Sequence, residues 1–170
     1  YSALASAVCK AGYEVVVIRG VDTHSDLIRE AGFKLVPLEI SRKGMHPLRE
    51  LATVLRLIRT LRRISSDVLH TIAQKPALYG SIASSLAGVP LLVAALPGLG
   101  WLFTSEEWRA RLGRRLVIRG YRILLKRPNV RVLVQNSTDR DELTQLAALD
   151  AALIPGSGVD LERFAPHSPP

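Results

Sequence analysis

Short apolar runs alternate with segments of helical periodicity along the 170 residues of this chain. The runs, rich in Val, Ile and Leu as buried parallel strands are, occupy residues 14–18, 33–38, 67–72, 90–96, 130–134 and 151–154. The helical segments, several of them opened by proline or followed by glycine, occupy residues 4–11, 26–31, 47–63, 76–87, 106–127 and 138–148. This alternation predicts right-handed crossovers and an α/β fold, a doubly wound, mostly parallel Rossmann-like sheet with helices on both faces.

In such a sheet, ligands bind beyond the carboxyl ends of the strands, where the loops converge. Gln74 and Lys75 lie at such a point, between a predicted strand and the helix that follows it. The Lys75 ammonium and the free backbone N–H groups of the first helical turn could jointly hold an anion. The alternative is a solvated lysine beside an ordinary helix start.

Three further residues complete the predicted substrate-binding set. Gly98 and Gly100 follow the next strand, and glycines there permit positive φ or a close approach of the backbone to a ligand. Asn136 follows the strand at residues 130–134. The chain contains no GxGxxG, P-loop or HExxH motif and no Cys/His spacing typical of metal ligands. We therefore predict no metal site, and the sequence identifies no catalytic residue.

Composition changes this picture in two ways. Apolar residues make up 48% of the chain, enough for a folded core, and no apolar run is long enough to span a membrane. Cys9 is the one cysteine, so the chain has no internal disulfide, which fits a cytoplasmic setting.

The net charge of +8 is concentrated in residues 42–63 and 106–127, each of which carries +6. At about 100° per residue, the second segment should turn one apolar arc to the sheet: Leu112, Leu116, Val117, Ile123 and Leu124. The opposite arc is basic, with two apolar residues among the charges: Arg111, Arg114, Arg115, Ile118, Arg119, Arg122, Leu125 and Lys126.

A basic helical face of this kind predicts contact with an anionic membrane surface through Arg115, Arg119 and Arg122. A solvated basic face is the alternative. Aromatic residues are only 5% of the chain and no nucleic-acid-binding module is present, so no nucleic-acid partner is predicted.

Six stretches carry a resemblance to a known family, in the expected order and over nearly the whole chain: residues 11–15, 70–81, 87–90, 98–100, 134–141 and 154–164. The last of them, leading out of the final strand, is the most specific. Together they resemble the amino-terminal domain of the retaining glycosyltransferases of family four, which have the GT-B architecture. The resemblance is greatest to bacterial members that add sugars to lipid-linked intermediates of polysaccharide or glycan synthesis.

The resemblance implies a domain organisation. Residues 1–155 would form the Rossmann-like acceptor-side domain, with its first strand expected upstream of Tyr1. Residues 156–170 would be a linker towards a carboxy-terminal domain that holds most of the donor.

It also implies a reaction and a location. The enzyme would transfer a sugar, with retention, from a nucleotide-sugar, UDP-linked by resemblance, to a lipid-linked or saccharide acceptor. The nucleotide-sugar would be a co-substrate, and no other cofactor is expected. The enzyme would be cytoplasmic and peripheral at the inner face of the cell membrane, and the isolated segment would be inactive.

No catalytic residue is carried over, because Pro97 and Gly98 stand where many relatives have a histidine. Two alternatives stay open. One is a nucleotide-sugar epimerase with the same two-domain layout, and the other is a non-catalytic domain that binds polyanions through its arginines.

Overall fold

The computed structural model describes residues 2–20, 25–40, 46–100, 103 and 107–156, without the side chains of Ser2 and of residues 108–110. The predicted linker at 156–170 lies outside this part except for Gly156. The elements follow the predicted alternation: α1 (Ser2–Lys10), β1 (Val16–Arg19), α2 (Ser25–Glu30), β2 (Lys34–Pro37), α3 (Pro47–Ile64), β3 (Val68–Ile72), α4 (Gln74–Ala87), β4 (Leu91–Leu96), α6 (Trp108–Leu124), β5 (Val130–Val134), α7 (Ser137–Ala147) and β6 (Ala151–Leu153).

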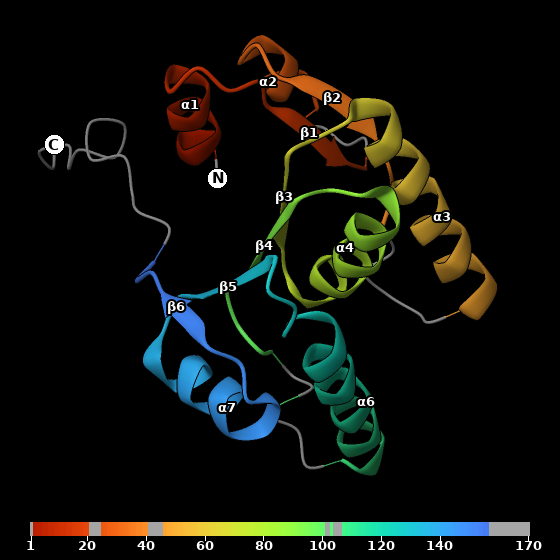
Figure 1. The fold of residues 1–170 in the computed structure, drawn as a ribbon, viewed down its shortest axis with the longest axis vertical. Coiled ribbons are helices and arrows are strands. Elements are labelled where there is room, and N and C mark those ends of the chain that lie inside the picture. Colours follow the sequence, from red (N-terminus) through yellow and green to blue (C-terminus); the bar gives the residue numbers. More distant parts are fainter. Residues whose placement is uncertain (1, 21–24, 41–45, 101–102, 104–106, 157–170) are drawn as a thin grey trace, which may run out of the picture.

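All strand pairs are parallel, and the strands form two sheets in the described part of the chain. β1 pairs with β2, while the larger sheet has the order β3-β4-β5-β6. Helices lie on both sides of the strands, with α1 and α2 on one side and α3, α4, α6 and α7 on the other (Figure 1). The predicted parallel α/β architecture is therefore confirmed.

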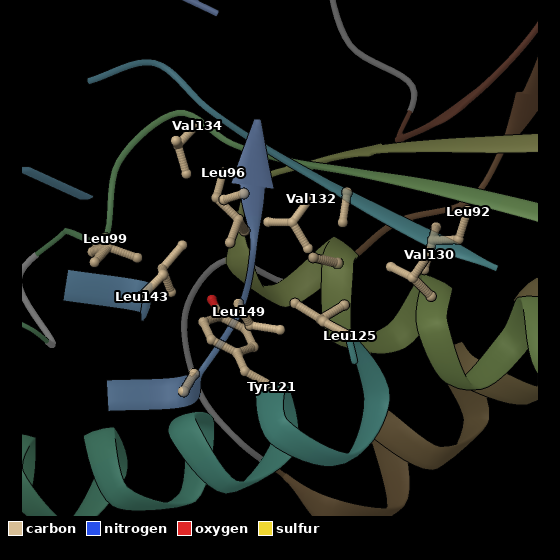
Figure 2. Close-up of a cluster of buried hydrophobic side chains, with 14 of the residues drawn as sticks. Leu92, Leu96, Leu99, Tyr121, Leu125, Val130, Val132, Val134, Leu143 and Leu149 are labelled. Carbon is tan, nitrogen blue, oxygen red and sulfur yellow. The ribbon is translucent and has the colours of Figure 1, made fainter. Parts of the chain in front are cut away.

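β4 lies at the centre of the larger core. Its side chains alternate between full and partial burial, and Leu92, Ala94 and Leu96 have no exposed surface. These three residues belong to one apolar cluster with side chains of β5, α4, α6 and α7 (Figure 2). A second cluster joins α3 and α4 and includes Leu57, Leu61 and Ala83.

Gly80 allows α4 to lie directly on β3. A Cβ atom at this position would come within 2.5 Å of Thr71 Cγ2 and 3.3 Å of Leu69 Cδ2. Real Cβ atoms do not approach other atoms as closely as 2.5 Å, and a β-branched strand residue such as Thr71 has little freedom to move away. The absence of a side chain at Gly80 therefore sets the distance between this helix and the sheet.

A polar brace joins α4 to the end of α6. The Ser81 hydroxyl, fully buried, donates to the Leu124 carbonyl at 2.7 Å. The Arg127 guanidinium donates to the Ser81 carbonyl at 2.7 Å, to the Ser81 hydroxyl at 2.8 Å and to the Leu124 carbonyl at 3.0 Å. These bonds satisfy polar groups that would otherwise be costly to bury.

The predicted orientation of α6 is wrong for three of its five apolar residues. Leu112, Leu116 and Ile123 are exposed, whereas Tyr121 and Leu125 are buried in the larger core. Ile118, expected on the basic face, packs against that core together with Val117. The helix has apolar side chains on two arcs, and the arc containing the bulky Tyr121 ring fills the space beneath the sheet (Figure 2). Periodicity alone could not choose between the arcs.

Replacing Gly80 by alanine should lower the free energy of unfolding. Overpacking costs about 1–3 kcal/mol, more than the gain of about 1 kcal/mol that alanine brings to a helix interior. Gly98→Ala is the matched control, because a Cβ there meets nothing within 4 Å. Urea denaturation of the two variants measures the difference, and equal midpoints would contradict the close packing of α4 on β3.

Tyr121→Phe should leave the protein as stable as before or more stable by about 1 kcal/mol. The Tyr121 hydroxyl is buried and has no hydrogen-bond partner among the described residues, and burial raises its pKa. Removing it eliminates an unpaired polar group while keeping the ring that fills the core. Calorimetric unfolding tests this prediction, which fails if the phenylalanine variant melts well below the wild type.

Candidate functional site

The carboxyl edge of the sheet carries the candidate site. α3, α4 and α6 each follow a strand of a parallel sheet, so their first turns lie towards this edge. α4 begins at Gln74, two residues before the predicted helix at 76–87. Gln74 and Lys75 therefore belong to the first turn of α4 and do not precede it.

Ala73 turns the chain from β3 into α4 in an unusual conformation. Its φ of 85° and ψ of 163° lie in a region that residues other than glycine rarely occupy. Two backbone bonds hold it there, from Ala73 N–H to the Ala95 carbonyl and from Ala77 N–H to the Ala73 carbonyl, each 3.0 Å long. This turn sets the direction in which Gln74 and Lys75 leave the strand.

Gln74 connects α4 to the loop that follows β4. Its side-chain amide donates to the Gly98 carbonyl at 3.3 Å and also to the Leu99 carbonyl. Gly100 has a φ of 63°, and a Cβ there would lie 3.7 Å from Gln74 Nε2. The structure thus brings together three of the predicted residues, Gln74, Gly98 and Gly100.

Lys75 points to the other side of the same turn and contacts α3. Its ammonium lies 2.8 Å from Glu50 Oε1 and 5.5 Å from the centre of the Tyr79 ring. The Tyr79 hydroxyl donates to Glu50 Oε2 at 2.7 Å. One carboxylate from the first turn of α3 therefore holds two side chains of α4.

The surroundings favour the ionised form of Glu50 and the protonated form of Tyr79. The hydrogen bond from Lys75, followed by that from Tyr79, lowers the pKa of Glu50 below its ordinary value of 4.5. Burial and the hydrogen bond to Glu50 raise the pKa of Tyr79. Because the folded-state pKa of Glu50 is lowered, its contribution to stability is present above pH 4.5 and is lost as the pH falls through the folded-state value.

Glu50 and Tyr79 were not among the residues predicted for the site. Glu50 left one signal in the sequence, since it is the single acidic residue within the basic segment 42–63. A lone carboxylate among seven basic residues indicates a specific partner, but the partner is 25 residues away and no local pattern identifies it.

Asn136 has a capping role in the structure. Its side-chain oxygen accepts from the Asp139 N–H at 2.7 Å, and its amide donates to Asp139 Oδ2 at 2.8 Å. It thus caps α7, and no contact described in the structure joins it to the residues around Gln74.

Arg115, Arg119 and Arg122 are exposed on α6, as predicted. Arg122 is tied to α7, because its guanidinium donates twice to the Leu146 carbonyl, at 3.0 and 2.6 Å. Arg115 and Arg119 make no hydrogen bond or ion pair with the described residues.

A depression of about 340 Å³ lies at the opposite edge of the sheet, at the amino ends of β3 and β4. Arg62, Ser65, Asp67 and Pro90 are among its lining residues, and none of the predicted site residues lines it. Within the described ranges, His, Cys, Asp and Glu residues do not gather into a group that could hold a metal ion.

The geometry at the carboxyl edge suits the binding of a polar, anionic ligand. The first turn of α4 places the Lys75 side chain, which is one-quarter exposed, at the positive end of the helix dipole. The Glu50 carboxylate offsets part of that charge and fixes its position. The hydrogen bonds of Gln74 hold the loop after β4, residues 98–100 (the glycine loop), against the same turn.

Known proteins match this chain in both sequence and structure. The model of the glycosyl transferase 4-like family matches residues 1–134. Among curated proteins, the N,N′-diacetylbacillosaminyl-diphospho-undecaprenol alpha-1,3-N-acetylgalactosaminyltransferase of Campylobacter jejuni is 25% identical over 155 residues, covering 90% of this chain and 41% of the relative. The UDP-Gal:alpha-D-GlcNAc-diphosphoundecaprenol alpha-1,3-galactosyltransferase of Escherichia coli is 28% identical over 122 residues, covering 70% of this chain and 30% of the relative.

A solved structure, a glycosyltransferase from Rickettsia africae, superposes with a TM-score of 0.68 at 14% identity, over 95% of this chain and 39% of that one. This likeness supports the fold. The chain spans less than half the length of either curated relative. None of the helices described here is long and apolar enough to cross a membrane. The family match over most of the chain shows that it belongs to the glycosyl transferase 4-like family.

Proposed function

We propose that the full-length protein carrying this chain transfers a sugar from a nucleotide-sugar, UDP-linked by analogy with the Escherichia coli relative, to an undecaprenyl-diphosphate-linked acceptor. The observation that carries the proposal is the family match together with two relatives whose names specify diphosphate-linked undecaprenol substrates. Retention at the anomeric carbon follows from the family resemblance. An epimerase is not favoured, because both relatives are transferases.

In this proposal the chain supplies the acceptor side. Lys75 and the first turn of α4 would approach a phosphate of the lipid diphosphate, since a cation at the positive end of a helix dipole favours anions. Gln74, Gly98 and Gly100 would shape the adjoining wall, with Asn136 holding the start of α7. The donor would be held mainly by a carboxy-terminal domain connected through residues 156–170.

In this proposal the lipid tail of the acceptor would hold the reaction at the membrane, on its cytoplasmic face by the family resemblance. Arg115 and Arg119 are exposed and unpaired within the described structure, so they would meet anionic headgroups. Arg122 would contribute with the part of its guanidinium that does not bond Leu146.

The full-length protein should transfer labelled sugar from a UDP-sugar to an undecaprenyl-diphosphate-linked saccharide. NMR of the product should show that the anomeric configuration of the donor is retained. Residues 1–170 alone should give no turnover, because the proposed donor-binding domain is missing. Hydrolysis or epimerisation without a transferred product would refute the transferase activity. Turnover by the isolated chain would refute the proposal that a carboxy-terminal domain is needed to bind the donor.

Lys75→Met should raise the KM for the lipid-linked acceptor more than Glu50→Gln does. Both variants break the 2.8 Å ion pair, but only the first removes the cation proposed to meet a phosphate. A hydrogen bond to a charged group contributes about 1.5–3 kcal/mol, so we expect about a tenfold or larger effect in the methionine variant. Steady-state kinetics on full-length variants measures it.

An equal rise in the KM for the acceptor in the two variants would assign Lys75 a purely structural role in holding α3 to α4. Thermal unfolding of both proteins separates this outcome from a folding defect.

A further inference from the structure

α6 exposes a row of large aliphatic side chains that its neighbours leave uncovered. Leu112, Leu116 and Ile123 are 53%, 62% and 60% exposed. At about 100° per residue, they share an arc of roughly 100° with Arg115 and Arg119. These five residues are the α6 outer face.

α3 repeats the arrangement on its own outer surface. Leu48, Leu51 and Leu55 are 72%, 56% and 41% exposed. They lie with the exposed residues Arg56 and Arg59 on one arc of roughly 140°. These five residues are the α3 outer face.

The two outer faces belong to helices on one side of the domain. α4 packs against both α3 and α6, and all three helices lie on the same side of the strands (Figure 1). Both helices begin towards the carboxyl edge, where Leu48 and Leu112 occupy their early turns. The paired faces therefore adjoin the candidate acceptor site around Lys75.

We propose that the α3 and α6 outer faces together dock the protein on an anionic bilayer, with their leucine and isoleucine side chains inserted at the boundary between headgroups and acyl chains. The proposal deepens the proposed function, on which it rests for the membrane location, and it adds apolar insertion to the arginine contacts. It also assigns a role to side chains that the helical periodicity had placed against the sheet.

Charge complementarity selects an anionic partner. α6 has six arginines and no acidic residue, and α3 has five arginines and one acidic residue, Glu50. Glu50 turns inward to Lys75 and Tyr79 and does not belong to the outer face. Neither outer face therefore contains a negative charge.

A second copy of the chain and a nucleic acid fit these faces less well. An isologous dimer would bring like-charged arginine sets together, which is unfavourable. A nucleic-acid backbone would engage the arginines but leave six exposed aliphatic side chains without an apolar partner. The bilayer interface satisfies both chemistries, since anionic headgroups adjoin the acyl chains there.

The orientation has a geometric consequence for the acceptor. With the early turns of α3 and α6 on the membrane, the carboxyl edge would lie at the level of the headgroups. A diphosphate that joins a membrane-buried lipid to a sugar occupies the same level. The docking surface would thus bring the candidate site to its acceptor without a spanning helix.

The test uses the full-length protein and vesicles of phosphatidylcholine with or without phosphatidylglycerol. Replacing Leu112, Leu116 and Ile123 together by Gln should weaken binding to the anionic vesicles by about tenfold or more, because exposed apolar area is lost without any change of charge. Leu27→Gln is the matched control, since Leu27 is 60% exposed on α2, on the other side of the strands, and should bind as the wild type does.

A second pair of variants separates insertion from charge. Arg115→Gln with Arg119→Gln should reduce the preference for phosphatidylglycerol and the sensitivity to salt. The variant in which Leu112, Leu116 and Ile123 are replaced by Gln should keep the preference for phosphatidylglycerol and the sensitivity to salt, although it binds more weakly. Turnover of a water-soluble acceptor analogue should be unchanged in the triple variant, so failed docking and failed transferase activity are told apart.

Three results would overturn the proposal. One is unchanged vesicle binding by the triple variant. Another is tighter binding to duplex DNA than to anionic vesicles at moderate salt. The third is a dimer, detected by analytical ultracentrifugation, that the triple variant abolishes.

Discussion

The burial of alternate side chains along β4 is the constraint on which the rest of this domain depends. Leu92, Ala94 and Leu96 have no exposed surface, and the helices that cover them must stay at fixed distances from the sheet. Gly80 sets that distance for α4, and the bonds of Ser81 and Arg127 hold the end of α6 to α4. A rigid helix layer results, and the first turns of its members become fixed positions around the carboxyl edge.

The candidate site is built from those fixed first turns. The conformation of Ala73 directs Gln74 towards the glycine loop and Lys75 towards Glu50. Each contact crosses between elements, so the site depends on how α3, α4 and the loop after β4 pack together. The same packing keeps α3 and α6 on one side of the strands. Acceptor recognition and membrane contact would therefore follow from a single helix layer.

Much of the fold could be predicted because it depends on local pattern. β-branched runs, helical periodicity and the glycines after several helices located every strand and helix described, mostly within two or three residues. Parallel topology also predicts the carboxyl edge as the ligand side, and the contact of Gln74 with the Gly98–Gly100 loop lies at this edge. Glu50 was missed because its partners lie on another helix, a relation that no periodicity encodes.

The sequence by itself determined the class of this protein: alternating strands and helices, a basic surface on two helices, and a family resemblance along most of the chain. Only the tertiary structure decided which arc of α6 is buried. The helix has two apolar arcs. The arc with Tyr121 and Leu125 is buried under the sheet, and Leu112, Leu116 and Ile123 are therefore exposed. The reason is physical: periodicity records which residues share a side of a helix, whereas burial depends on the shape and volume of what the helix meets.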